Sequence, residues 1–409
     1  MNSLAISCFV LFLLLNGASR VAESRAVAAG DLSSQRRHRH HGHHHDIDSP
    51  PTDDDGDTDS PPSDDDDDAD SPPADAKPKK LLVFGDDFAD TGNGDSDPKR
   101  GVLSRSWRSP FGMSDTAHGR QPSGRFSDGL VQPDFLAKIL GHSESPPPYT
   151  YDDWDDGIDA AGLNFAVGFS VALDTPAGVP APAGVPAPAG VPKLREQVQQ
   201  LRNLIRDGVV ERKDLRDSVA LLTYSGGDYA YVDNDAMNGT ISKVIDELAS
   251  IVSDLQDLGV PKVLVNTVIS YGCTPWLTRR SSNPYSSCDD GRSWVSDEHN
   301  TALRDRLGGE EDVMLLDVNS VVRDLVEPKE GSTLYGKQFK ERLRPCCEAA
   351  DDDAGDYCGL DGRYSLCEHP EEYFFWDIEH PTQAGWRAVM QLLQGPIMAF
   401  LGISNLEHF

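Results

Sequence analysis

Short apolar segments that alternate with helical patterns constrain the fold of this chain more than any other feature. The apolar runs lie at 81–84, 219–223, 263–268 and 313–317, and amphipathic helical periods lie at 194–205, 241–258, 294–307 and 383–401. Short apolar runs bounded by turn residues are typical of strands that are buried on both faces. The alternation predicts an α/β domain with a central parallel sheet covered by helices on both faces.

The carboxyl ends of these strands are the first place to look for chemistry, because open parallel sheets bind ligands there. The first strand is followed by Gly85-Asp86-Asp87-Phe88-Ala89-Asp90. We expect Asp86 to be structural, buried beside the strand end and hydrogen-bonded to backbone. We expect Asp90 to cap a following helix by accepting from its free N–H groups.

The N-terminus has the pattern of a sorting signal. Residues 6–15 form an apolar run, and the small-residue pattern Ala26-Val27-Ala28 follows. This predicts a secretory signal peptide over residues 1–28, cleaved between Ala18 and Ala29. The run is too short to span a bilayer comfortably. The mature protein is therefore predicted to be secreted and extracellular, with no stable membrane anchor.

Residues 29–80 contain a histidine tract and an Asp-Ser-Pro-Pro motif that recurs every eleven residues. Such a segment cannot bury enough apolar surface to offset chain entropy, so it is predicted to be a disordered arm. The favoured interpretation is a solvated spacer; the alternative is weak metal binding, because a compositional tract is not a defined coordination site. The possible ligands are His38, His40, His41, His43, His44 and His45.

The charge of the chain excludes two classes of partner. The formal net charge is −31, and fourteen aspartates between Asp46 and Asp75 account for nearly half of it. Nucleic acids and anionic membranes repel such a chain, so neither is expected as the main partner. The sequence contains no phosphate-binding loop, dinucleotide fingerprint or zinc-protease motif, so no cofactor is predicted for the domain.

Six cysteines follow the predicted signal peptide, and an even number in a secreted chain favours disulfides. Adjacent Cys346 and Cys347 are expected to have different partners, and the connectivity stays open. Asn238 begins an Asn-Gly-Thr glycosylation sequon, which indicates an exposed loop. The disulfide candidates are Cys273, Cys288, Cys346, Cys347, Cys358 and Cys367.

A second polar motif, Asp377-Ile378-Glu379-His380, precedes the last helical pattern. An Asp three residues before a His can orient the imidazole and stabilise its charge. The other histidines of the predicted domain have no such neighbour and are expected to be solvated. They are His118, His142, His299, His369 and His408.

These two motifs, together with blocks at 124–129, 164–166 and 225–229 and the Cys346-Cys347 pair, resemble the signatures of the plant GDSL esterase/lipase family, a branch of the SGNH hydrolases. The resemblance runs from Leu81 to the C-terminus, so residues 81–409 are predicted to form one domain. It implies a three-layer, flavodoxin-like α/β fold that hydrolyses carboxylic esters. The expected partner is a small acyl ester or a cell-wall-type ligand.

The resemblance also assigns roles to individual positions. Asp377 and His380 match the family's Asp-x-x-His pair, but the nucleophilic Ser position is occupied by Asp87. The third-block Asn position is Gly227. The remaining oxyanion-hole position is Gly168, followed by Phe169 where a second Gly is usual.

These departures predict impaired or repurposed chemistry. The carboxylate of Asp87 has no proton to give His380 and is a weak acyl nucleophile. Its charge would also hold His380 protonated and repel a developing oxyanion. Loss of one oxyanion donor, here the Asn side chain, typically costs about 10²–10³ in rate. The bulk and restricted φ of Phe169 would misplace its N–H.

Three hypotheses therefore compete. The first is a non-catalytic binding protein for acyl or cell-wall ligands on an SGNH fold. The second is residual hydrolysis, with Asp377 and His380 activating water or with another hydroxyl such as Ser127 recruited. The third is direct attack of Asp87 on an alkyl carbon. Whether the chain is an active enzyme stays open at the level of sequence.

Overall fold

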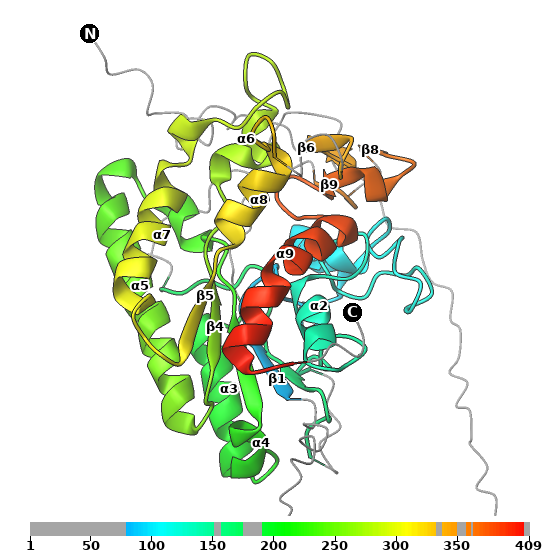
Figure 1. The fold of residues 1–409 in the computed structure, drawn as a ribbon. Helices are drawn as coiled ribbons and strands as arrows, with labels where there is room; N and C mark the ends of the chain where they lie inside the picture. The colour runs from blue at the N-terminus through cyan, green and yellow to red at the C-terminus, as the bar shows by residue number, and fades with distance from the viewer. Residues whose placement is uncertain are drawn as a thin grey trace, which may run out of the picture. The chain divides into compact units, whose positions relative to one another are not determined.

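A computed structural model describes residues 79–150, 157–174, 190–332, 338–349, 357–360 and 363–404. The predicted signal peptide and the histidine-containing arm lie outside the described residues, apart from residues 79 and 80. Figure 1 shows the fold.

The described chain is built on a five-stranded parallel sheet with the order β2-β1-β3-β4-β5. This confirms the α/β class and the flavodoxin-like order, which places β1 and β3 side by side. All four predicted apolar runs form strands; β2 was not predicted, because it has only three residues. The strands are β1 (Lys80–Phe84), β2 (Gly162–Asn164), β3 (Ser218–Leu222), β4 (Val263–Asn266) and β5 (Val313–Leu316).

Side chains that alternate along each strand build a separate core on each face of the sheet. In β1, Leu81 and Val83 pack against one set of helices, whereas Leu82 and Phe84 pack against the other. Figure 1 shows the resulting layers, with α5 and α7 on one side of the sheet and α2 and α9 on the other. The first core involves α2 (Gln132–Ile139), α8 (Val318–Val326) and α9 (Gln383–Leu401), and the second involves α3 (Leu194–Arg206), α5 (Asn234–Leu258) and α7 (Trp294–Leu307).

Local capping fixes the ends of the helices that frame the fold. The side chain of Thr382 accepts from the backbone N–H of Gly385 and so begins α9, directly after the Asp377–His380 motif. Helix α5 ends at Gly259, which has a left-handed φ of 109°. Asn238 is exposed, but it lies within α5 rather than in the predicted loop.

The C-terminal third adds two small sheets, and two disulfides lie at the second of them. Strands β6 (Glu341–Pro345) and β9 (Tyr373–Phe375) pair in parallel, and β7 (Cys347–Ala349) and β8 (Tyr364–Leu366) pair antiparallel. As predicted, the adjacent cysteines have different partners. The disulfides are Cys273–Cys288, Cys346–Cys367 and Cys347–Cys358.

Short helical segments complete the connections. They are α4 (Arg212–Arg216), α6 (Pro275–Thr278), and the 3-10 helices η1 (Pro98–Trp107), η2 (Gly227–Tyr231), η3 (Tyr271–Cys273), η4 (Asp290–Arg292) and η5 (Pro370–Glu372). Among the described residues, no helix combines the length and apolar character needed to cross a membrane.

Candidate functional site

The polar residues that follow β1 and β3 meet at the carboxyl edge of the sheet. The turn after β1 needs glycine, because Gly85 has a φ of 149° and a Cβ there would lie 1.9 Å from Thr223 Oγ1. Gln197 of α3 clamps this turn: its amide accepts from the Gly85 N–H and donates to the Gly85 carbonyl, each at 2.8 Å. The backbone just before Asp86 and Asp87 is thereby held in place.

Asp86 is buried and joins the ends of β1 and β3, as expected for a structural residue. Its carboxylate accepts from the backbone N–H groups of Phe88 and Ser225 and from the Thr223 hydroxyl. Burial, together with the nearby charge of Asp87, raises the pKa of Asp86 to about 7. Burial and the neighbouring carboxylate therefore disfavour the ionised form of Asp86.

Asp377 and His380 come from the other end of the domain's sequence, and Asp377 orients the imidazole of His380. Asp377 Oδ1 lies 2.8 Å from His380 Nδ1 and also accepts from the backbone N–H groups of Glu379 and His380. Because a carboxylate only accepts, Nδ1 carries a proton. The pKa of Asp377 lies below its ordinary value: burial would raise it, but the His380 interactions and the charge of Arg105 lower it further.

The other ring nitrogen of His380 faces Asp87. Nε2 lies 3.2 Å from Asp87 Oδ2, within ion-pair distance. This contact does not have hydrogen-bond geometry, and the buried Nε2 has no hydrogen-bond partner among the described residues. Burial alone would lower the pKa of His380, but the charges and contacts of Asp377 and Asp87 raise it to about 10. An imidazole held in this way is protonated at neutral pH.

Two further charged residues belong to the site and were not identified from the sequence. Arg105 of η1 is fully buried, and its Nη2 lies 3.4 Å from Asp377 Oδ2 and 3.8 Å from Glu379 Oε1. Glu379 Oε1 also lies 4.0 Å from His380 Nε2. Glu379 stands inside the Asp377–His380 motif, so its position was visible in the sequence; Arg105 gave no comparable local signal.

Aromatic rings enclose the charged cluster. The Phe126 ring stacks on His380 with centroids 5.2 Å apart, and Phe88 meets the same ring edge-on. The Arg105 guanidinium lies over the rings of Phe126, Phe169 and Tyr357. The exposed fraction of the His380 side chain is 1% and that of Asp87 is 7%, whereas Glu379 is 39% exposed. Glu379 is thus the solvent-facing member of the cluster.

Two of the predicted oxyanion-hole positions, Gly168 and Phe169, pack against Phe126 of this cluster. The Gly168 N–H already donates to Asp90 Oδ2 at 2.7 Å. Phe169 has a φ of 68°, a left-handed conformation that is uncommon for a residue with a Cβ. Gly227 begins η2 and has no side-chain donor, and a Cβ there would lie 3.3 Å from Val171 Cγ1.

Asp90 does not cap a helix, contrary to prediction. A loop follows it, and its carboxylate accepts from the N–H groups of Gly92, Asn93 and Gly168. The side chain therefore organises the loop instead of a helix start.

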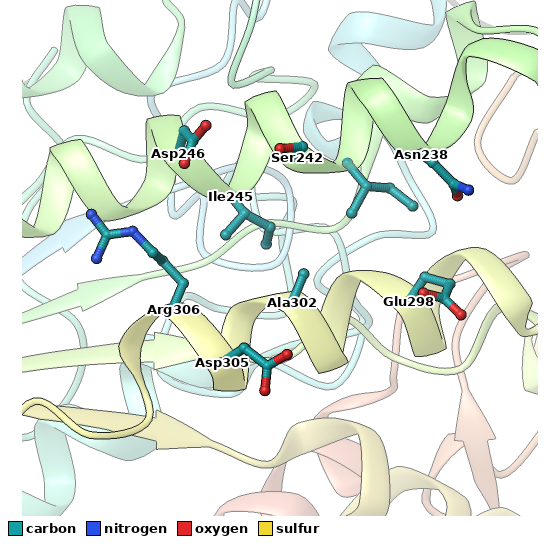
Figure 2. Close-up of a pocket in the computed structure, with 9 residues that line it drawn as sticks. Asn238, Ser242, Ile245, Asp246, Glu298, Ala302, Asp305 and Arg306 are labelled. Atoms are coloured by element: carbon teal, nitrogen blue, oxygen red, sulfur yellow. The ribbon is translucent and has the colours of Figure 1, made fainter.

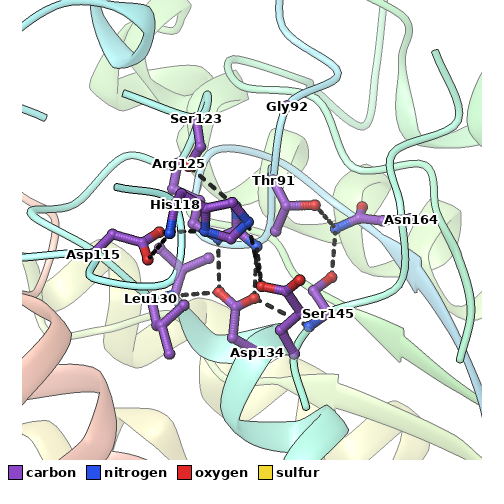
Figure 3. Close-up of polar contacts among 12 residues, drawn as sticks. Thr91, Gly92, Asp115, His118, Ser123, Arg125, Leu130, Asp134, Ser145 and Asn164 are labelled. Carbon is purple, nitrogen blue, oxygen red and sulfur yellow. Dashed lines mark hydrogen bonds and ion pairs between the residues drawn. The ribbon is translucent and has the colours of Figure 1, made fainter. Parts of the chain in front are cut away.

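The block around Arg125 is structural. Arg125 and Asp134 form a buried two-point ion pair with contacts of 2.9 and 2.8 Å, and Asn164 donates to Thr91 and Ser145 nearby (Figure 3). These contacts tie the first three signature blocks together. The charged and amide side chains of these blocks therefore have structural partners.

Other sequence-based expectations are corrected by burial. Ser127 is fully buried, and its hydroxyl donates to the Pro381 carbonyl at 3.0 Å with Asp128 Oδ1 at 3.2 Å, so no described contact brings it to His380. His299 is also fully buried, with Nδ1 2.7 Å from the Tyr229 hydroxyl, rather than solvated. Its position on α7, in step with buried Val295 and Leu303, was a sequence signal for this burial.

Two of the remaining histidines are half-buried and hydrogen-bonded, and one is exposed. His118 contacts Asp115 at 2.7 Å, and His142 contacts the Lys79 carbonyl at 3.0 Å. His369 is exposed, as expected. His408 lies outside the described residues.

A hollow of about 390 Å³ lies between α5 and α7, where Figure 2 shows its lining side chains. It is lined in part by Asn238, Asp246, Glu298, Asp305 and Arg306, and by none of the residues around His380. The glycosylation candidate therefore borders this hollow and not the carboxyl edge of the sheet.

The fold and site together define a three-layer α/β protein with a hydrolase-type Asp–His pair at the carboxyl edge of its parallel sheet. The chain belongs to the GDSL-like lipase/acylhydrolase family, whose model matches residues 81–393. Enzymes of this description hydrolyse esters, and this confirms the family predicted from the motifs.

Relatives in Arabidopsis thaliana carry the same family name. GDSL esterase/lipase At5g03600 is 35% identical, over 80% of this chain and 96% of its own length. GDSL esterase/lipase At5g03610 is 31% identical, over 80% of this chain and 88% of its own length. Among solved structures, an acetylxylan esterase from Geobacillus stearothermophilus is similar with 12% identity and a TM-score of 0.33, covering 80% of this chain and 95% of that chain.

Proposed function

We propose that this chain is a secreted member of the family in which ordinary ester hydrolysis is impaired, and that it binds a small acyl or cell-wall-type ester without efficient turnover. One observation carries the proposal: the group 3.2 Å from His380 Nε2 is the carboxylate of Asp87 and not a hydroxyl. Acyl-enzyme chemistry needs a hydroxyl that gives its proton to this nitrogen, and an ionised carboxylate has none.

The surroundings of Asp87 oppose the reaction further. A tetrahedral intermediate would place a second negative charge beside the Asp87 carboxylate. The Gly168 N–H is occupied by Asp90, and Gly227 supplies no side-chain donor. A side-chain exposure of only 1% for His380 also restricts the approach of an acyl group to this nitrogen.

Secretion is supported by the chemistry of the described cysteines. All six form disulfides, which persist in oxidising compartments and are rare in the cytosol. The predicted signal peptide over residues 1–28 gives the same expectation. N-terminal sequencing of protein recovered from culture medium is expected to find a new terminus between Ala18 and Ala29; an intact Met1 on the extracellular protein would contradict it.

The test of impaired hydrolysis is turnover of short-chain p-nitrophenyl esters by the full-length purified chain. We expect the unmodified chain to hydrolyse them no faster than His380→Ala. Activity that His380→Ala abolishes would overturn the proposal and favour water activation by the Asp377–His380 pair. Binding of the unreacted ester is then measured separately. Bound ester is expected to protect the intrinsic fluorescence of the protein from an added quencher.

Two substitutions at position 87 separate the roles of charge and hydroxyl. Asp87→Ser restores a group that can give a proton to His380, so we expect it to gain His380-dependent turnover. Asp87→Asn removes the same charge but adds no hydroxyl and should stay at background. Equal gains in both variants would show that charge alone, and not the missing nucleophile, limits the reaction.

A further inference from the structure

Three side chains converge at the carboxyl edge of the sheet, and the proposed function uses only two of them. One ligand-type atom from each of Asp87, Glu379 and His380 lies within 4.8 Å of the other two. Within the part of the chain that the structure describes, this is the one place where three such groups converge. Ligand atoms around a tetrahedral zinc ion, with bonds of about 2.1 Å, are about 3.4 Å apart. The observed contacts of 3.2 and 4.0 Å to His380 Nε2 are near this spacing.

His380 is oriented as a metal-binding histidine would be. Asp377 accepts the Nδ1 proton at 2.8 Å, which directs Nε2 toward Asp87 and Glu379. Nε2 is buried and lacks a hydrogen-bond partner among the described residues, which is costly for a polar atom. A carboxylate that holds the second nitrogen of a ligating imidazole is the usual outer partner of a metal-bound histidine.

The charges around the cluster are also suited to a divalent cation. Three carboxylates, those of Asp87, Asp377 and Glu379, surround the imidazole, and the nearby cation is Arg105, which contacts Asp377 and Glu379. With the imidazole protonated, these five groups carry a net charge of one negative. Buried charge of one sign is unfavourable unless it is paired or coordinates a metal.

The donor atoms select among metals. One imidazole nitrogen and two carboxylate oxygens suit a first-row divalent ion better than calcium or magnesium, which prefer oxygen alone. Three protein ligands that leave a position for water are typical of an open zinc site. We propose that Asp87, Glu379 and His380 bind one divalent transition-metal ion, with zinc the expected occupant.

This inference goes beyond the proposed function and gives Asp87 a positive role. A Ser at position 87 would leave only two of the three ligands. The same residue that removes acyl-enzyme chemistry therefore completes the metal site. Glu379 can close on an ion by a side-chain rotation, because it is the exposed member, whereas Asp87 and His380 are fixed by burial.

The histidine tract at residues 38–45 requires a background variant for the test, since it can bind zinc itself. The full chain is prepared without a metal-affinity tag and with asparagine at His38, His40, His41, His43, His44 and His45. Equilibrium dialysis against Zn²⁺, followed by elemental analysis, gives the stoichiometry and affinity. We expect one zinc per chain and a higher thermal unfolding midpoint with zinc than with a chelator, because the ion binds the folded state.

Substitutions at the ligands locate the bound ion. Loss of an outer-shell partner alone lowers metal affinity by about 10- to 100-fold, so Glu379→Gln and Asp87→Asn should each weaken zinc binding by at least that factor. Glu379→Gln is the safer variant for folding, because the side chain is partly exposed. Glu371→Gln is the matched control: it removes the carboxylate of an exposed His–Glu pair with a 3.2 Å contact and should leave zinc binding unchanged.

Two outcomes would overturn the proposal. One is the absence of stoichiometric zinc in the background variant. The other is zinc binding that is equally strong in Glu379→Gln and in the control. Cobalt substitution gives an independent readout in the same background, since a Co²⁺ ion bound by His380 has visible absorption bands that zinc abolishes on competition. None of these measurements depends on ester turnover, so they stand apart from the test of the proposed function.

Discussion

Nε2 of His380 lies 3.2 Å from Oδ2 of Asp87, while Nδ1 of the same ring lies 2.8 Å from Oδ1 of Asp377. One buried imidazole is thus held between two carboxylates. In an acyl-transfer site the first of these positions would hold a hydroxyl.

Restoring the side-chain donor at position 227 should strengthen any activity gained at position 87. We expect Asp87→Ser/Gly227→Asn to hydrolyse p-nitrophenyl esters up to about 10²- to 10³-fold faster than Asp87→Ser, because loss of one oxyanion donor typically lowers kcat by this factor. Asp87→Ser/Gly227→Ala is the control, since its Cβ meets Val171 in the same way but donates nothing. Equal kcat values for the two double variants would show that position 227 does not face the oxyanion.

Gly168 is required by the packing of Phe126 against the site. A Cβ at Gly168 would lie 2.5 Å from Phe126 Cε2, and the Phe126 ring stacks on His380. We expect Gly168→Ala to lower the free energy of unfolding by about 1–3 kcal/mol, measured by urea denaturation. Gly239→Ala, in the exposed face of α5 with no atom within 4 Å, should be neutral or slightly stabilising. A neutral Gly168→Ala would mean that the ring moves freely.

Breaking the buried Arg125–Asp134 pair should destabilise the fold. Arg125→Leu leaves the Asp134 carboxylate buried without its cation, and this typically costs about 3–5 kcal/mol. Arg304→Ala removes an exposed pair with Asp317 and should change the free energy of unfolding by less than about 1 kcal/mol. Urea denaturation of both variants measures the difference. Similar losses in the two would contradict the structural role of the Arg125 block.

His299 should make the protein less stable in mild acid. Burial lowers the pKa of His299 to about 3, so the folded chain keeps this ring neutral while the unfolded chain binds a proton near pH 6.5. The contribution of the neutral His299 to the free energy of unfolding is therefore complete above the pKa of the unfolded chain. It is lost as the pH falls toward the pKa of the folded chain. Between about pH 7 and about pH 5 the loss is about 2 kcal/mol.

The variant that tests this pH dependence is His299→Gln, which can keep a hydrogen bond to Tyr229 but does not titrate. Its free energy of unfolding, from urea denaturation with disulfides intact, should fall less between these two pH values than that of the unmodified chain. The same pH dependence in both would assign the acid sensitivity to other groups.

Much of the fold could be predicted because its signals are local. The apolar runs of β1, β3, β4 and β5 and the amphipathic periods of α3, α5, α7 and α9 are continuous in sequence. Strand β2 was missed because three residues cannot show a period. The Asp377–His380 contact could be predicted because the spacing of three residues brings both side chains together.

The rest of the site depends on contacts between distant segments. Arg105 lies on a 3-10 helix with no amphipathic pattern, so nothing local indicated that it would be buried over three aromatic rings. The role of Asp90 differs from the predicted helix cap because its N–H partners come from a loop and from Gly168, which is distant in sequence. His299 was expected to be solvated, although its position on the apolar face of α7 indicated burial.

The site joins the first strand of the domain to the residues just before its last helix, because Asp87 follows β1 and His380 precedes α9. During synthesis, a ribosome would release Asp87 long before Asp377 and His380 leave its exit tunnel. Closing so long a loop is entropically unfavourable and slow. The nascent chain therefore carries an Asp87 without its His380 contact until its C-terminal segment is complete, and a chain truncated before Asp377 lacks the site altogether.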